Sequence, residues 1–257
     1  MGLHPDPGLD RDGMEDLQRE VAAAAVFADE FAFAPGAVAI DDPIEAGQAT
    51  LGGDGGPVVV GIDQAFSDEA AVSAAVAVRG GRVVERAAGR APLEMEYVPG
   101  LLSFREAPAV LDALGNLSVE PDLLVVDGSG RIHFRQAGIA THVGVLRDVP
   151  AVGVAKNLLC GTPRQSLEDP LPEGERVAIE ADDSVEATNE GGEWPVVGYA
   201  YQSRQYPDPE RRHVNPLYVS PGHRVGATTA VALVAALAAG YKLPEPTRLA
   251  DAYADTL

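Results

Sequence analysis

The segment that most constrains the fold is Pro121–His133, which reads PDLLVVDGSGRIH. Within it, Leu123–Val126 is an unbroken apolar run, which is typical of a strand buried on both faces. The run ends at Asp127, followed by Gly-Ser-Gly. Because strands of open α/β sheets carry their ligands at the carboxyl ends, Asp127 is a candidate metal-binding or catalytic acid. The alternative is a simple turn after a buried strand.

The order of the other elements predicts the fold class. Short apolar runs and turn residues predict strands at 58–62, 70–78, 82–88, 123–126 and 151–155, with helices at 103–117 and 137–146 between the later strands. This order is that of a ribonuclease-H-like α/β fold, a mixed sheet of three antiparallel and two parallel strands with helices on both faces. Topology alone does not establish function.

Further elements are expected on either side of this unit. Met14–Phe31 has helical spacing with Asp12 as N-cap, and residues 33–56 form a connector. Ser103 and Glu106 have the spacing of a capping box at the start of the helix 103–117. Extended segments are predicted at 194–201 and 217–219, and helices at 228–239 and after Pro246.

The charge of the chain is strongly negative but unevenly distributed. The 257 residues have a net charge of −20. Residues 1–56 hold 12 acids and 2 arginines, and residues 165–205 hold 10 acids and 2 arginines. Only two basic residues are lysines, Lys156 and Lys242. Concentrated salt screens the repulsion among so many acids, so the composition favours a source with a salt-loaded cytoplasm, a halophilic archaeon.

Composition also limits the class of protein. The chain has no apolar run long enough to span a membrane and no signal peptide, so a cytoplasmic protein without a membrane contact is expected. The single cysteine, Cys160, excludes an internal disulfide and a multi-cysteine metal site. The length suits one large α/β domain with added segments.

Three acids fall at the ends of predicted elements. Asp63 ends the strand 58–62, Glu106 lies in the first turn of the helix 103–117, and Asp127 ends the strand 123–126. If the two strands are neighbours, the acids meet at one edge, repel one another and raise each other's pKa. A divalent cation such as Mg²⁺ would relieve this repulsion. Each acid taken singly has a plainer explanation, as a solvated strand end or a helix-first-turn acid.

At this point six segments resemble the endonuclease V family of deoxyinosine-specific DNA repair nucleases. They are GIDQAF (61–66), EYVPGLLSFREAPAVL (96–111), PDLLVVDGSGRIHFRQAGIATHVGVL (121–146), PAVGVAKNLLCG (150–161), NPLYVSPGHRV (215–225) and GYKLPEPTRLAD (240–251). The resemblance implies a catalytic domain at 57–257 with an acidic insertion around 165–193. It does not extend to residues 1–56, which we interpret as an acidic N-terminal extension with one helix.

The resemblance implies catalytic roles. Asp63, Glu106 and Asp127 would bind Mg²⁺, with Mn²⁺ as a substitute, and Lys156 would lie near the scissile phosphate. His223, in the PGHR segment, would orient the nucleophilic water or contact the metal. The alternatives are a capping or loop histidine at position 223 and a structural ion pair between Lys156 and Asp127.

The resemblance also implies a lesion pocket. Tyr97 would be the wedge that fills the gap left by a flipped base. The other residues expected around the base are Pro99, Gly100, His133 and Gly138. Three positions depart from the family pattern and bear on substrate preference, because Glu96, Ser129 and Phe134 stand where proline, histidine and proline are usual.

The implied activity is metal-dependent hydrolysis of the second phosphodiester bond 3′ to deoxyinosine or another deaminated base in DNA. The products would carry 3′-hydroxyl and 5′-phosphate ends, and the enzyme would act as a monomer. One alternative is an endonuclease of the same family that acts on inosine-containing RNA. A non-catalytic lesion-binding protein is disfavoured by the intact acids, and a sugar-kinase or actin-like ATPase by the missing second half.

Overall fold

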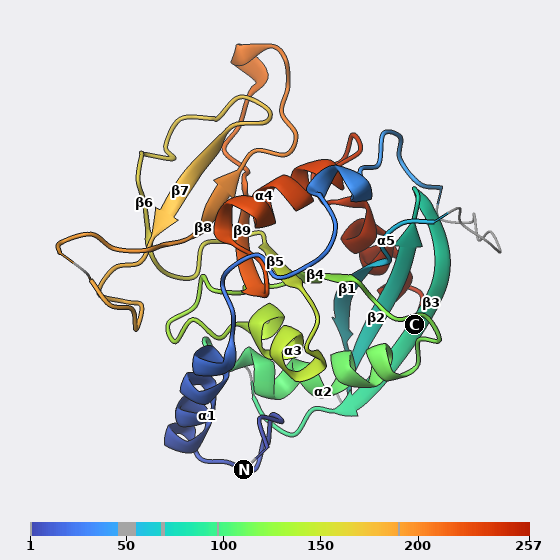
Figure 1. The fold of residues 1–257 in the computed structure, drawn as a ribbon, viewed down its shortest axis with the longest axis vertical. Coiled ribbons are helices and arrows are strands. Elements are labelled where there is room, and N and C mark those ends of the chain that lie inside the picture. The colour runs from blue at the N-terminus through green and yellow to red at the C-terminus, as the bar shows by residue number, and fades with distance from the viewer. Residues whose placement is uncertain (1, 46–54, 68–69, 97, 190) are drawn as a thin grey trace.

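In the computed structural model, which describes residues 2–45, 55–67, 70–96, 98–189 and 191–257, one mixed sheet runs through the molecule (Figure 1). It has nine strands in the order β3-β2-β1-β4-β5-β9-β8-β7-β6. The strands are β1 (Val59–Phe66), β2 (Ala70–Arg79), β3 (Arg82–Pro92), β4 (Leu123–Asp127), β5 (Ala151–Ala155), β6 (Thr162–Pro163), β7 (Arg176–Glu180), β8 (Val196–Tyr201) and β9 (Leu217–His223).

The first five strands pair as the sequence predicts. β1 is antiparallel to β2 and parallel to β4, and β4 is parallel to β5. The apolar run of β4 is fully buried, as expected for a strand covered on both faces. β1 continues three residues beyond Asp63, so this acid lies within the strand and not at its end.

The prediction of a five-stranded sheet is wrong, because the sheet does not stop at β5. The extended segment 217–219 is part of β9, which pairs antiparallel with β5 and brings β8, β7 and β6 into the same sheet. β7 was hidden in the acidic region because only Val177 and Ile179 of its five residues are buried. Such a short alternation carries little signal between charged neighbours.

The described residues form five α-helices, and the last four of them lie against the sheet. They are α1 (Arg11–Ala24), α2 (Leu102–Gly115), α3 (Ile139–Arg147), α4 (Ala227–Ala236) and α5 (Glu245–Ala254), with short 3₁₀ helices η1 (Pro35–Val38) and η2 (Pro209–Arg211). α2 and α3 pack on one face, and α4 and α5 on the other (Figure 1). α5 lies directly on β1, since a Cβ at Gly61 would be 2.0 Å from the carbonyl carbon of Pro246.

Two helix predictions need correction. α1 is capped by Asp10 and not by Asp12, and it ends at Ala24, well before Phe31. α2 has Leu101 as its N-cap, and Ser103 lies inside the first turn with no capping box. Ser103 is buried, and its hydroxyl faces the side chain of Gln18 on α1 instead of the backbone of its own helix.

The segment predicted as an N-terminal extension packs onto the rest of the molecule. Met14 and Leu17 of α1 form a small core with Leu101 and Phe104. Farther along, Val38, Ile40 and Ile44 join the larger core under α4 and α5. No helix in the described ranges is long and apolar enough to cross a bilayer.

Candidate active site

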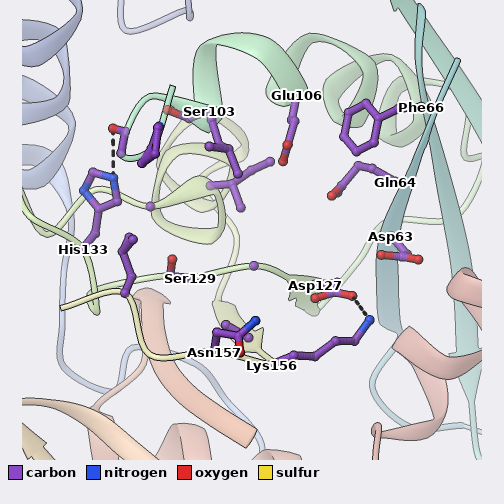
Figure 2. A pocket seen from close by; sticks show the side chains of 18 of the residues that line it. Asp63, Gln64, Phe66, Ser103, Glu106, Asp127, Ser129, His133, Lys156 and Asn157 are labelled. Carbon is purple, nitrogen blue, oxygen red and sulfur yellow. Dashed lines mark hydrogen bonds and ion pairs between the residues drawn. The ribbon is translucent and has the colours of Figure 1, made fainter. Parts of the chain in front are cut away.

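A cleft of about 450 Å³ lies at the carboxyl ends of β1, β4 and β5. Four residues predicted to act in catalysis and four predicted to bind the lesion line it (Figure 2). They are Asp63, Glu106, Asp127 and Lys156, and Pro99, Gly100, His133 and Gly138. Tyr97, the predicted wedge, lies outside the described residues.

The three predicted acids lie close together, with Asp63 and Glu106 directed toward Asp127. Ile62 of β1 pairs with Val126 of β4. Asp63 and Asp127, the next residue in each strand, therefore lie side by side at the same edge of the sheet. The carboxylate of Asp127 lies beside both Asp63 and the Nζ of Lys156, and Glu106 projects from α2 toward the same space (Figure 2). Parallel pairing thus brings together side chains that are far apart in the chain.

Burial and mutual repulsion act on these carboxyl groups. Burial, followed by the charge of Asp127 and a hydrogen bond to it, raises the pKa of Asp63 to about 8. Burial, with a further contribution from Asp127, raises the pKa of Glu106 to about 7, although Arg105 opposes the change. Keeping both groups ionised at neutral pH therefore requires additional positive charge.

Lys156 supplies one such charge. Its Nζ donates to Oδ2 of Asp127 over 3.1 Å, and its side chain remains half-exposed. Burial opposes the charged form of Lys156, but Asp127, Asp63 and Asp251 outweigh it and raise the pKa of the ammonium group. Lys156 thus stays protonated and faces the open cleft.

Asp251 is a fourth acid of the cleft that sequence reasoning missed. It lies on α5 and lines the cleft with Asp63 and Asp127. Its charge adds to the rise in the pKa of Asp63. Asp251 is the last residue of the segment GYKLPEPTRLAD, which resembles the family, so the sequence offered a signal for it. Whether its side chain faces the cleft depends on how α5 packs on β1, which the sequence does not show.

The donor set suits a hard divalent cation. Carboxylate oxygens are what Mg²⁺ and similar ions prefer, and a cation would relieve the repulsion that raises the pKa of Asp63 and Glu106. Within the described part of the chain, no three His, Cys, Asp or Glu side chains are already drawn together around a metal position. Asp63 is hydrogen-bonded to Asp127, and Glu106 interacts with Asp127 through its charge. Water and phosphate oxygens would complete the shell around a cation.

The prediction that His223 belongs to the site is wrong in its geometry. His223 pairs with Ala151 at the amino end of β5, whereas the acids lie at the carboxyl end of the parallel strands. Its Nδ1 accepts the backbone N–H of Val26 and its Nε2 donates to Asp148. Because β9 is antiparallel to β5, PGHR ends at the opposite edge of the sheet. His223 instead binds the backbone of Val26, just after the end of α1.

On the lesion side of the cleft, Gly100 is the shared partner of three buried side chains. Its φ of +81° is a conformation that favours glycine, and a Cβ here would be 2.8 Å from the Phe134 ring. Three N–H groups converge on its carbonyl oxygen, from Gln18 Nε2 at 2.9 Å, His133 Nε2 at 3.1 Å and an Arg135 Nη at 3.2 Å. The turn before α2 is therefore fixed from several directions.

His133 acts in this network as a neutral ring. Its Nδ1 accepts the backbone N–H of Arg135, so Nε2 carries the proton that it donates to Gly100. Burial and the charge of Arg135 lower the pKa of His133 to about 3. His133 therefore lines the cleft while both ring nitrogens are bonded to the protein.

Gln18 is a second residue that sequence reasoning missed. It is fully buried, donates to Gly100, and accepts from Nε of Arg135 at 2.7 Å. Arg135 also lies 3.6 Å from Glu15 of α1. The available signal was the position of Gln18 at helical spacing from Met14 and Val21, on the apolar side of α1, but its partners are more than 80 residues away in the chain.

Comparison with known proteins places these features in context. Residues 49–252 match the family described as Endonuclease V. Endonuclease V of Halobacterium salinarum is 65% identical over 99% of this chain and 97% of that protein. Endonuclease V of Haloarcula marismortui is 56% identical over 98% of this chain and 93% of that protein.

Solved structures show the same fold. Endonuclease V from Streptomyces avermitilis matches with a TM-score of 0.72 and 31% identity, covering 100% of this chain and 97% of that one. The endonuclease V of Ciona intestinalis was solved in complex with a 24mer DNA containing an inosine followed by a ribo-adenosine. It matches with a TM-score of 0.67 and 22% identity, covering 95% of this chain and 96% of that one.

Proposed function

The chain belongs to the endonuclease V family and is a nuclease, and we propose that it nicks DNA at deoxyinosine and other deaminated bases. Hydrolysis occurs at the second phosphodiester bond 3′ to the lesion and leaves 3′-hydroxyl and 5′-phosphate ends. The observation that carries the proposal is the shared cleft, in which the acids and Lys156 lie beside the residues expected around the lesion. The inosine-containing DNA bound by the Ciona relative supports this substrate.

The lesion side of the cleft receives the flipped base. A deaminated base pairs poorly and costs less to extrude from the stack, which provides part of the selectivity. Pro99, Gly100 and Gly138 form the walls beside the base, and the bonded ring of His133 keeps the turn in place. A pocket already held in shape loses little entropy when the base enters.

On the catalytic side, Asp63, Glu106, Asp127 and Asp251 would hold a divalent cation, Mg²⁺ or Mn²⁺. When bound, the cation lowers the pKa of water and stabilises negative charge in phosphodiester hydrolysis. The ammonium group of Lys156 binds a non-bridging oxygen of the scissile phosphate. The carboxylates around Lys156 favour its charged form, so this contact persists at neutral and mildly alkaline pH.

Nicking of a duplex with one central inosine tests the proposal. With Mg²⁺, we expect one cut at the second bond 3′ to inosine, and no cut with EDTA or in the matched adenine duplex. Asp127→Asn and Asp251→Asn should each lower kcat by roughly 100-fold or more. His223→Gln, at the other edge of the sheet, is the control and should retain kcat within about threefold.

Two results would overturn this assignment. The first is full Mg²⁺-dependent nicking by Asp127→Asn. The second is equal cutting of the inosine and adenine duplexes. A loss of kcat in His223→Gln, without loss of the folded state, would restore His223 to the site.

Inosine-containing RNA is the second candidate substrate. The DNA bound by the Ciona relative carries a ribo-adenosine after the inosine, so a ribonucleotide at that position is compatible with that protein. Three oligonucleotides of one sequence separate the candidates: inosine DNA, inosine DNA with one 3′ ribonucleotide, and inosine RNA. The substrate with the highest kcat/KM identifies the preferred backbone.

We also propose that residues 57–257 form the catalytic domain, since all four acids lie within them. The acidic segments 1–56 and 165–193 would be additions, although α1 and β7 are built into the fold. The protein would act as a cytoplasmic monomer.

A further inference from the structure

A second cleft, of about 210 Å³, is lined by the loop between β8 and β9 and by the connection between α4 and α5. Arg204, Tyr206, His213, Asn215 and Lys242 contribute to its lining. One of the two lysines of the chain therefore lines each cleft, Lys156 the first and Lys242 the second. We refer to this second cleft as the Arg204–Lys242 cleft.

Sheet register places the Arg204–Lys242 cleft next to Lys156. Tyr201 at the end of β8 pairs with Leu217 at the start of β9, so the loop between them leaves the sheet at one edge. Ala155, the last residue of β5, pairs with Tyr218, so Lys156 follows the strand at the same edge. The carbonyl of Lys242 accepts the hydroxyl of Ser203 at 2.6 Å, which ties the α4–α5 connection to this loop.

The cations of this cleft are available to a ligand. In the described ranges, neither Arg204 nor Lys242 forms an ion pair with a carboxylate. Nearby acids bond to backbone instead, Glu173 to the N–H of Gln205 and Asp208 to the N–H of Glu210. Burial and the charge of Lys156 lower the pKa of Lys242, so the two ammonium groups are close enough to interact.

The lesion side of the catalytic cleft and the Arg204–Lys242 cleft belong to opposite faces of the sheet. Gly100 and Gly138 precede α2 and α3, which cover one face. Lys242 lies between α4 and α5, which cover the other face. The acids and Lys156 lie at the edge between these faces (Figure 2). A strand with its base in the lesion pocket therefore crosses the acids before it reaches the Arg204–Lys242 cleft.

We propose that the Arg204–Lys242 cleft binds the phosphodiester backbone of the cut strand on the 3′ side of the scissile bond. The inference rests on the proposed function, because the direction of the strand follows from a cut placed 3′ to the lesion. Backbone phosphates are the chemistry that fits, since the guanidinium of Arg204 and the ammonium of Lys242 are strong donors to phosphate oxygens. In a chain of net charge −20, these two cations would attract the DNA backbone at the place where the strand must pass.

The first test measures binding of an inosine duplex by fluorescence anisotropy, in EDTA, over a KCl series in which circular dichroism shows an intact fold. The double variant Arg204→Gln/Lys242→Gln should reduce the slope of log Kd against log[KCl] by about 1.5 and weaken binding on the order of tenfold. Arg82→Gln/Arg147→Gln is the matched control, with the same change of charge at exposed arginines near the amino ends of the strands. It should leave the slope unchanged.

The second test asks on which side of the cut the cleft acts. Trimming the substrate to about two nucleotides beyond the scissile bond should weaken binding by the wild type and leave binding by the double variant nearly unchanged. Trimming the 5′ side should affect both proteins equally. A salt slope that matches the control, or equal sensitivity of both proteins to 3′ trimming, would overturn the proposal.

Failure of this inference differs from failure of the proposed function. If the wild type does not nick inosine substrates, the proposed function fails, whatever the salt slope. If the wild type nicks them but the double variant binds and responds to trimming as the wild type does, only the 3′ backbone site fails.

Discussion

At the scale of single residues, Asp127 is where the electrostatics of the site converge. Its carboxylate bonds to Lys156 and raises the pKa of both Asp63 and Glu106. Burial is the larger cause of each rise, so the sheet edge itself makes these acids costly to ionise. The same burial prepares them to hold a cation, since a bound cation favours the ionised forms.

The raised pKa of Asp63 predicts how stability depends on pH. Without metal, folded Asp63 holds its proton up to about pH 8, whereas the unfolded group releases it near 3.8. The folded state therefore binds more protons between these values, and the free energy of unfolding falls as pH rises through this range. Asp63→Asn removes the contribution, so in EDTA its Tm should exceed that of the wild type increasingly from pH 5 to pH 9.

Thermal unfolding followed by circular dichroism measures this difference. Saturating Mg²⁺ should reverse the order, because the cation stabilises only the protein with the full set of acids. A Tm difference between wild type and Asp63→Asn that stays constant from pH 5 to pH 9 in EDTA would contradict the assignment.

The sequence allowed part of this site to be predicted. Asp63 and Asp127 follow apolar runs, and parallel pairing of such runs brings their ends together. Asp251 was missed because its position depends on how α5 packs on β1, which no local pattern encodes. His223 was misplaced because PGHR was interpreted as a loop before a helix, whereas its first three residues continue β9.

At the scale of elements, α1 is joined to the lesion side of the cleft by a buried polar network. Gln18 contacts Gly100, Ser103 and Arg135, and Glu15 lies near Arg135. A buried donor or acceptor without a partner is costly, so these contacts specify one position of α1 against the turn before α2. α1 therefore helps to shape the proposed lesion pocket although it lies outside the matched family region.

Replacing Gln18 tests this connection. Gln18→Leu leaves Nε of Arg135 without its acceptor and removes one donor from Gly100, which should lower the free energy of unfolding by roughly 1–3 kcal/mol. The looser turn should raise KM for the inosine duplex more than it lowers kcat. Glu20→Gln, exposed on the same helix, is the control. Gln18→Leu with the stability and KM of the wild type would show that the network is dispensable.

The elements themselves were predictable where the pattern was long or strongly apolar. β1, β2, β4 and β5 fall close to their predicted positions because each is a buried apolar run. The strands beyond β5 were not assigned to the sheet. β6 has only two residues, and β7 (RVAIE) buries only two of its five residues. A short strand beside charged loops is specified by its pairing partner more than by its own residues.

At the scale of the whole molecule, the charged residues and the apolar cores occupy different places. The cores on the two faces of the sheet consist mainly of Val, Ala, Leu and Ile, whereas the acids that give the net charge of −20 are mostly exposed. Exposed like charges repel in dilute buffer and are screened within about 3 Å at 1 M salt.

Salt should therefore stabilise the protein. Raising KCl from about 0.1 M to 1 M, where the Debye length falls from about 10 Å to 3 Å, should raise Tm because screening removes repulsion among exposed acids. Sucrose of equal osmolality, which does not screen charge, is the control and should raise Tm less. A Tm that is independent of KCl would contradict a halophilic adaptation.

The close packing of α5 on β1 has a consequence for the order of events in the cell. Asp63, Glu106 and Asp127 emerge from the ribosome more than a hundred residues before Asp251, and Gly61 is shaped to receive the backbone of the helix that carries it. A nascent chain that has not yet been translated through α5 would hold an incomplete set of acids. Nuclease activity is therefore expected only after α5 has been synthesised and has packed on β1.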